Sequence, residues 1–454
     1  MDLQTVVLCA GKGTRMNTEK AKVMHEIMGR PMLEYIYNIC TNITDEKPIF
    51  VVGHKKEQIM DYFGEKAIYV SQDEQLGTGH AIKLTQDKLK EGMHVLIMCG
   101  DTPLLSQSTV KQLIDALDDD TDAMIVSSFL DEPFGYGRIV KDENGDFVKI
   151  VEQKDATHEE ALVKEVNSGI YIIKSELIKK FVGGIDTDNA QGEYYLTDIF
   201  KKLKENGYAI KTFRIKSSEI LGVNNRVQLE KVRCTMQRSI NRRLMERGVT
   251  MINPDSIYIH DTVEIGKDTV IYPNNYITGQ TKIGEGCVLY SDNEIQDSII
   301  KDDVKIRKSF IEKSTVEESV SIGPYAHLRP NAYICEKAHI GNFVEIKNAN
   351  IGQGSKAAHL SYVGDADVGK DVNIGCGVIF VNYDGKHKQR SVVKDSAFIG
   401  SNSNLIAPVT VGEKGYVATG STVTDDVPAK SLCIARSRQV IKADWTKKSK
   451  LLDK

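Results

Sequence analysis

Aliphatic residues recur every six positions through much of the second half of the chain. The longest regular series is Ile265, Ile271, Ile277, Ile283, Leu289 and Ile295. The same spacing returns at Phe310, Val316, Ile322, Leu328, Ile334, Ile340 and Ile346, and again from Val393 to Val423. A helix repeats every 3.6 residues and a flat strand every two, so neither explains this period. Coils of three short strands do, and the pattern therefore predicts a hexapeptide-repeat parallel β-helix.

Interruptions of this period predict where the coils change. One-residue slips at Ile351 and Val368 indicate coil sides that are one residue short. A polar stretch from Asn382 to Arg390 predicts an inserted loop. Glycine follows many of the aliphatic positions, which suits tight corners between strands.

The first 225 residues or so show a different alternation, of short apolar runs and helical stripes. Thr5–Cys9, Ile49–Val52 and Val95–Met98 are predicted strands, and Pro31 is predicted to open a helix. Such alternation is typical of a mostly parallel sheet covered by helices.

A helical stripe with charged residues between its apolar positions separates the two patterns. We therefore predict a domain at 1–225, a helical linker at 226–248 and a β-helix domain at 249–454. The five arginines from Arg233 to Arg247 are compatible with nucleic-acid binding, but a solvated face on a connecting helix is the favoured interpretation.

The amino-acid composition limits the classes of protein to which the chain can belong. The chain has 454 residues, 27% charged and 41% hydrophobic, with a net charge of -4, which argues against a general nucleic-acid or membrane-surface binder. We expect no secretory signal, and no apolar run reaches the roughly 18 residues that cross a bilayer. Eight scattered cysteines without a C-x-x-C pair favour reduced thiols in a cytoplasmic protein.

A glycine-rich basic loop follows the first predicted strand. In the segment from Leu8 to Met16, backbone N–H groups can approach phosphate oxygens, and Lys12 and Arg15 can neutralise them. A simple tight turn is the alternative for a G-x-G alone. The dinucleotide fingerprint is excluded because Met16 stands where its third glycine is needed.

Asp101 lies just beyond another predicted strand, where open α/β sheets place ligands. Its carboxylate suits Mg²⁺, which favours oxygen ligands. The alternative for a single aspartate at a strand end is the N-cap of a helix.

Together these motifs resemble the bifunctional N-acetylglucosamine-1-phosphate uridyltransferase / glucosamine-1-phosphate acetyltransferase family. The motifs are G-x-G-T-R-M at 11–16 with Lys22, the loop from Gln72 to Ala81, Gly135–Arg138, Asn167–Gly169 and Gly222–Asn225. The resemblance covers nearly the whole chain. It implies a Rossmann-like α/β nucleotidyltransferase domain followed by a left-handed parallel β-helix.

The resemblance also implies the first site. Arg15 and Lys22 would be catalytic, and Asp101 and Asn224 would hold Mg²⁺. The residues that would bind UTP and the UDP-sugar are Leu8, Cys9, Ala10, Gly11, Lys22, Gln72, Gly77, Thr78, Cys99, Gly100, Asp101, Gly137, Glu152, Asn167 and Asn224. Cys99 departs from the aromatic residue common at this position.

The second predicted site is centred on His359. An amine that attacks a thioester loses a proton, and a near-neutral imidazole is a fitting base, although a lone histidine is more often a surface or capping residue. By resemblance, the acceptor glucosamine-1-phosphate would contact Arg329, Lys347, Tyr362 and Asn373. Acetyl-CoA would contact Cys376, Asn382, Tyr383, Ser401, Thr419 and Arg436, where Cys376 and Thr419 replace alanines common in the family. The family also implies a homotrimer.

Two other interpretations remain open from the sequence. One is a monofunctional sugar-nucleotide pyrophosphorylase with a regulatory β-helix. The other is a non-catalytic relative resembling exchange-factor subunits. The set around His359 argues against the first, and the intact loop with Lys22 and Asp101 argues against the second.

Overall fold

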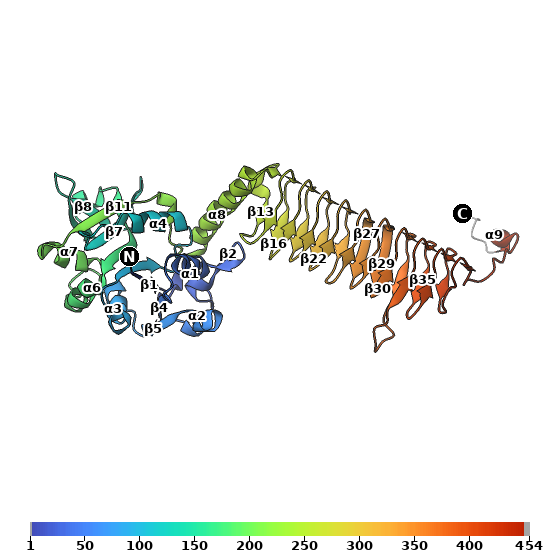
Figure 1. Ribbon diagram of the computed structural model, residues 1–454, viewed down its shortest axis with the longest axis horizontal. Helices are drawn as coiled ribbons and strands as arrows, with labels where there is room; N and C mark the ends of the chain where they lie inside the picture. Colours follow the sequence, from blue (N-terminus) through green and yellow to red (C-terminus); the bar gives the residue numbers. More distant parts are fainter. Residues whose placement is uncertain (1, 449–454) are drawn as a thin grey trace. The chain divides into compact units, whose positions relative to one another are not determined.

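The computed structural model describes residues 2–448, which form two compact units that divide between Met236 and Gln237 (Figure 1). The division falls within helix α8 (Arg226–Glu246), in the region of the predicted linker. Which activity belongs to which part of the chain stays a prediction.

A mixed sheet forms the centre of the first unit. Its strand order is β11-β7-β10-β6-β1-β4-β5. The strands are β1 (Leu3–Leu8), β4 (Ile49–Val52), β5 (Ile68–Ser71), β6 (His94–Cys99), β7 (Ala123–Phe129), β10 (Glu165–Lys174) and β11 (Ile210–Arg214). Strands β1, β4, β5 and β6 are parallel, while β10 runs antiparallel to β6 and β7. The predicted mostly parallel sheet is therefore confirmed, with β10 reversed among the strands named here.

Helices cover both faces of this sheet. Helices α1 (Met32–Ile43), α2 (Lys56–Phe63) and α4 (Gln107–Asp115) supply residues to one buried cluster. Helices α3 (Thr78–Lys83), α6 (Ser175–Phe181) and α7 (Asp198–Glu205) supply residues to the other. Each helix buries an apolar stripe, which is the main source of its stability.

The helix that Pro31 opens lies where the sequence predicts it. Pro31 is the N-cap of α1, and its φ of -55° is already compatible with a helix start. By contrast, the N-cap alternative for Asp101 is wrong. Helix α4 begins six residues later, with Ser106 as the N-cap that accepts a hydrogen bond from Thr109 N.

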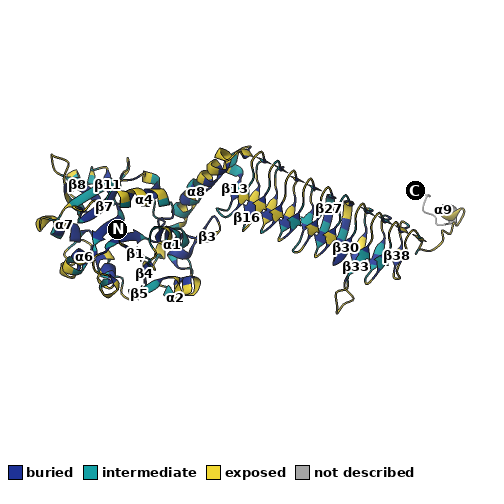
Figure 2. Ribbon diagram, in the orientation of Figure 1, coloured by how far each residue is buried: buried dark blue, intermediate teal, exposed yellow. Residues whose placement is uncertain are grey.

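Two stacks of very short parallel strands form the second unit, one of 19 strands and one of nine within the described residues. The register joins Ile265 to Ile283 and Ile271 to Leu289. Figure 2 shows buried segments in dark blue along the stack. Typical strands are β15 (Val270–Ile271), β18 (Val288–Leu289) and β21 (Lys305–Ile306). The predicted parallel β-helix is thus confirmed.

The structure adds three details of the repeat, and one of them, the shorter coil at Ile351, confirms the prediction. Phe310 is not inward: it is 53% exposed and packs edge-on to His327, while Ile311 is buried, because the coils there are shorter than in the regular series. The slip at Ile351 is a shorter coil, since Ile334 pairs with Ile351, one residue closer than Ile265 and Ile283. Many repeat glycines serve close coil contact rather than positive φ: a Cβ on Gly341 would collide with Ala358 O.

The predicted insertion is a loop between β32 (Ile379–Val381) and β33 (Ser391–Val393). Arg390 fixes its end with two 2.6 Å hydrogen bonds to the carboxylate of Asp367. Among the described residues, none of the helices is long and apolar enough to cross a membrane.

Candidate active sites

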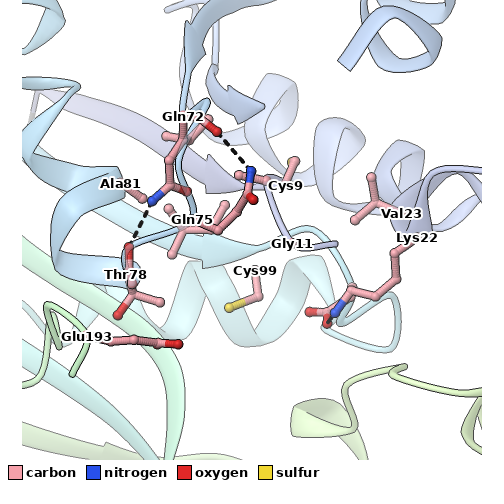
Figure 3. Close-up of a pocket in the computed structure, with 15 residues that line it drawn as sticks. Cys9, Gly11, Lys22, Val23, Gln72, Gln75, Thr78, Ala81, Cys99 and Glu193 are labelled. Atoms are coloured by element: carbon pink, nitrogen blue, oxygen red, sulfur yellow. Dashed lines mark hydrogen bonds and ion pairs between the residues drawn. The ribbon is translucent and has the colours of Figure 1, made fainter. Parts of the chain in front are cut away.

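A cavity of about 270 Å³ lies at the carboxyl ends of β1 and β6 in the first unit (Figure 3). It joins segments far apart in the sequence: the glycine-rich loop, the Gln72 loop and the end of β6. The predicted residues on its wall are Leu8, Cys9, Ala10, Gly11, Lys22, Gln72, Gly77, Thr78, Cys99 and Asp101. The others lie outside this wall, among them Arg15, which is exposed on the short 3-10 turn Thr14–Met16.

The Gln72 loop is held in a fixed shape. Gln72 is 4% exposed, and its Nε2 donates to Gly77 O at 3.0 Å. Gly77 adopts φ 110°, and a Cβ there would lie 2.5 Å from Tyr194 O, so the position requires glycine. The Nε2 of Gln72 also lies 3.2 Å from His80 Nδ1, so the side-chain amide has a fixed orientation at the cavity wall.

Three polar side chains meet at one side of the cavity. Lys22 Nζ lies 2.5 Å from Asp101 Oδ2 and 3.1 Å from Asn224 Oδ1. The Lys22 and Asp101 side chains are only 15% and 16% exposed. Two oxygens from distant parts of the chain thus converge on one cation, and the cation is the ammonium group of Lys22.

The two cysteines of the cavity are held as thiols. Burial raises the pKa of Cys99 to about 12, with a smaller contribution from the carboxylate of Asp101. Burial likewise raises the pKa of Cys9 well above its ordinary value. A thiol with such a pKa is protonated at neutral pH and is a poor nucleophile.

Gly137, Glu152 and Asn167 form a neighbouring group. Asn167 N donates to Gly137 O at 2.9 Å, and a Cβ on Gly137 would lie 3.3 Å from the Glu152 carboxylate. Burial raises the pKa of Glu152, while a hydrogen bond from Thr197 Oγ1 opposes that shift. The bare backbone of Gly137 therefore leaves room beside an acidic side chain.

In the second unit, His359 faces solvent and pairs with an asparagine of the preceding coil. Its Nδ1 lies 2.8 Å from Asn342 Oδ1, and the two residues are register partners in β27 (His339–Lys347) and β29 (Lys356–Gly364). An amide oxygen only accepts hydrogen bonds, so Nδ1 carries the proton in this pair. In the neutral form of the ring, the lone pair then lies on Nε2.

A column of predicted residues continues from His359 along successive coils. Gly377 N donates to Leu360 O, Asn402 N to Cys376 O, and Gly420 N to Ser401 O. These bonds bring four predicted residues into line. Cys376 and Ser401 supply bonded carbonyls, and His359 and Thr419 come directly before the bonded residues Leu360 and Gly420. At about 4.8 Å per coil, the three steps span roughly 14 Å, so the column suits an extended ligand. Arg436 lies beside its far end, where its Cδ is 3.8 Å from a Cβ built on Gly420.

Cationic side chains gather beside Tyr362. Arg329 Nη1 donates to Glu345 Oε1 at 2.8 Å, and Glu345 is the register partner of Tyr362. The pKa of Lys347 is lowered, first by Lys388 and then by Arg329, so the three cations lie close together. Such a cluster favours an anion.

Asn382 also lies beside Tyr362, since its Nδ2 is 3.4 Å from Tyr362 Oη. Two further predicted residues are less closely involved. Asn373 lies on β31 (Asn373–Ile374) as the register partner of Lys356 and Phe398. Tyr383 is 56% exposed and donates to Gly385 O within the inserted loop.

Several known proteins match this chain over nearly its full length and over nearly their own. The protein "Bifunctional protein GlmU" of Clostridioides difficile (strain 630) is 45% identical over 455 residues, covering 100% of this chain and 99% of its own. The chain belongs to the GlmU family. Its counterparts in Shouchella clausii and Carboxydothermus hydrogenoformans are 45% and 46% identical over 447 residues, each covering 98% of this chain and 98% and 100% of their own.

Family models match parts of the same chain. One described as a MobA-like NTP transferase domain matches residues 5–163, and one described as bacterial transferase hexapeptide (six repeats) matches residues 313–348. A solved UDP-glucose pyrophosphorylase complexed with UDP-glucose covers 53% of this chain and 100% of its own at 18% identity. Its TM-score of 0.45 is too low to carry an argument.

No site role was predicted from the sequence for several residues that the structure places at these sites, although Gln75 is part of the loop from Gln72 to Ala81. Glu193 and Gln75 line the cavity, and Gln58 Oε1 accepts from Ala21 N at 2.7 Å, which fixes the loop before Lys22. Asn342 and Lys388 belong to the second site. Asn342 had a signal, since the strand register follows from the repeat, whereas Glu193 and Gln58 reach the site only through tertiary packing.

Proposed function

We propose that this protein makes UDP-N-acetylglucosamine in two reactions. The second unit transfers acetyl from acetyl-CoA to the amine of glucosamine-1-phosphate. The first unit then transfers uridylyl from UTP to N-acetylglucosamine-1-phosphate and releases pyrophosphate. Membership of the GlmU family supports both steps. The observation that carries the proposal is the column that ends on His359, because a merely regulatory β-helix needs no such site.

For uridylyl transfer, the sugar-phosphate oxygen attacks the α-phosphorus of UTP and pyrophosphate leaves. Such reactions depend on positioning and on neutralising charge. Gln72, with the backbone at Gly77, would orient the uracil, and Lys22 and Arg15 would neutralise phosphate oxygens. The pocket beside Gly137 and Glu152 would hold the sugar. The protonated thiols of Cys9 and Cys99 are consistent with direct transfer.

Asp101 and Asn224 would hold Mg²⁺. The fit is supported by the convergence of Asp101 Oδ2 and Asn224 Oδ1 on a single cationic atom. These are oxygen donors of the kind that Mg²⁺ prefers, and substrate phosphates commonly complete its coordination. When bound, Mg²⁺ would offset the negative charge of the phosphate groups.

For acetyl transfer, the amine nitrogen attacks the thioester carbonyl and the thiolate of coenzyme A leaves. His359 Nε2 would accept the proton that the amine loses, since Asn342 holds the proton of the ring on Nδ1. Acetyl-CoA would lie along Cys376, Ser401 and Thr419, with Arg436 at the far end.

The acceptor phosphate would bind the cation cluster of Arg329, Lys347 and Lys388, and Tyr362 and Asn373 would contact its sugar. Asn382 and Tyr383 would complete the acetyl-CoA site. We further propose a cytoplasmic homotrimer that supplies peptidoglycan synthesis, as the family resemblance implies, with no nucleic-acid or membrane partner.

One experiment tests both steps. The full-length protein receives glucosamine-1-phosphate, acetyl-CoA, UTP and Mg²⁺, while free thiol, pyrophosphate and UDP-N-acetylglucosamine are measured. We expect all three products, and only free thiol when UTP is left out. Absence of free thiol from an otherwise active protein would overturn the acetyl step and favour the monofunctional alternative.

A fragment ending near Gly248 separates the activities. It should uridylylate N-acetylglucosamine-1-phosphate without acetylating glucosamine-1-phosphate. Acetylation by the folded fragment would show that the activities are assigned to the wrong parts of the chain.

A further inference from the structure

Asp365 lies between the proposed acceptor side and the proposed acetyl-CoA side of the second site. It is only 8% exposed and follows Gly364, the last residue of β29. Its carboxylate and both of its backbone polar groups form hydrogen bonds to different parts of this site. No role for Asp365 follows from the repeat pattern, because the residue occupies a coil corner.

The acceptor side meets Asp365 at the strand that carries Lys347. Asp365 N donates to Lys347 O at 3.0 Å. Asn348, the next residue along the chain, donates from Nδ2 to Asp365 Oδ1 at 2.5 Å. Asp365 thereby fixes the backbone from which the Lys347 ammonium group extends.

The acetyl-CoA side meets Asp365 at the inserted loop. Asn382, which begins the loop and is 9% exposed, donates from Nδ2 to Asp365 Oδ2. Ser391 N, just beyond the loop, donates to Asp365 O at 3.1 Å. Both ends of the loop are therefore tied to one residue, and the amide of Asn382 has a fixed orientation.

We propose that Asp365 is a positioning residue for acetyl transfer, which sets Asn382 against acetyl-CoA at a fixed place relative to Lys347. The proposal rests on the proposed acetyltransferase function. A carboxylate is required because each oxygen accepts from a different amide nitrogen. An amide at position 365 offers one oxygen, and its nitrogen opposes one of the two donors.

The test measures acetyl transfer by full-length protein with acetyl-CoA varied at saturating glucosamine-1-phosphate. Asp365→Asn should raise the KM for acetyl-CoA about tenfold, the order expected when a hydrogen bond to a charged group is lost. The kcat should stay within about threefold, since His359 is untouched. A merely structural role would instead lower kcat by reducing the active fraction and leave KM unchanged, and that result would overturn the proposal.

A double-mutant cycle shows whether Asp365 acts through Asn382. In the Asn382→Ala background, Asp365→Asn should change the KM for acetyl-CoA by less than about twofold. A full tenfold effect in that background would overturn the proposal. Asn348→Ala is the matched control, because it removes a donor from the same carboxylate and leaves the Asn382 bond. Its KM should stay within about twofold of wild type, and a rise equal to that of Asp365→Asn would also overturn the proposal.

Asp365→Glu distinguishes the effect of the position of the carboxylate oxygens from the effect of its charge. If thermal unfolding shows that Asp365→Asn does not fold, Asp365→Glu replaces it in the double-mutant cycle with Asn382→Ala. The longer side chain keeps the charge but misplaces both oxygens, so its KM should rise as in Asp365→Asn. Wild-type behaviour of Asp365→Glu would show that charge alone matters and would overturn the proposal. An inactive wild-type protein would instead overturn the acetyltransferase function itself, so the two failures are distinguishable.

Discussion

The ammonium group of Lys22 lies where the proposed metal ligands converge, so removing its charge should expose a stronger cation site. Asp101 Oδ2 and Asn224 Oδ1 are both within hydrogen-bonding distance of Lys22 Nζ, and the charged pair is largely shielded from water. A metal ion that binds these oxygens in the nucleotide-free protein must first displace the ammonium group. Lys22→Met keeps a side chain of similar length and leaves the carboxylate of Asp101 unpaired.

The size of the expected gain in metal affinity follows from the hydrogen bond between Lys22 and Asp101, which the metal ion no longer has to break in Lys22→Met. A hydrogen bond to a charged group contributes about 1.5–3 kcal/mol. Removing that competition should tighten metal binding by about ten- to a hundredfold, since each factor of ten corresponds to about 1.4 kcal/mol. The assay is titration of the nucleotide-free protein with Mn²⁺, in which the electron paramagnetic resonance signal of free Mn²⁺ reports the unbound fraction.

Two variants serve as controls for this titration. Lys22→Arg keeps the positive charge and should bind Mn²⁺ about as weakly as wild type. Adding Asp101→Asn to Lys22→Met should abolish the gain, because the anionic ligand is lost. Equal Mn²⁺ affinity in wild type and Lys22→Met would refute the reasoning. A gain that survives Asp101→Asn would show that the metal lies elsewhere.

Other changes test the remaining side chains. His359→Ala should lower acetyl transfer by about 10²–10⁴, the usual contribution of a general base, while uridylyl transfer persists; equal loss of both rates would contradict the assignment. Because burial raises the pKa of Glu152, the folded protein binds this proton more tightly than the unfolded chain, so the free energy of unfolding falls as pH rises from the ordinary pKa through the raised one and then stays lower. Glu152→Gln should therefore raise the melting temperature of the first unit at pH 7 while reducing uridylyl transfer; an unchanged melting temperature would speak against a charged, partly buried Glu152. Iodoacetamide should modify exposed Cys376 before Cys99, whose pKa is raised to about 12, and should block acetyl transfer unless acetyl-CoA protects the thiol. Peptide mass spectrometry, together with the acetyl-transfer and uridylyl-transfer assays, distinguishes the two cysteines. Full acetyl transfer after modification of Cys376 would place acetyl-CoA elsewhere.

Local patterns account for much of what could be predicted about the fold. The six-residue period is a property of neighbouring residues, so it predicted the β-helix and the inserted loop before any contact was known. Phe310 is the exception that shows the limit. Where the coils shorten, a fixed period places the wrong residue inside, and only the stacking of the next coil, with His327 on Phe310 and Ile311 inward, decides which side chain is buried.

The two candidate active sites show the same difference between what local sequence patterns predict and what tertiary packing decides. By itself, the sequence determined that the chain has two unlike repeat patterns, with a glycine-rich loop at Gly11 and a histidine in the six-residue repeat, because these are short and local features. Only the tertiary structure decided that Lys22 lies between Asp101 and Asn224, and that Asp365 joins the strand of Lys347 to Asn382. Those contacts depend on the paths of segments far apart in the chain, and hydrogen bonds of about 3 Å are fixed by packing rather than by residue type.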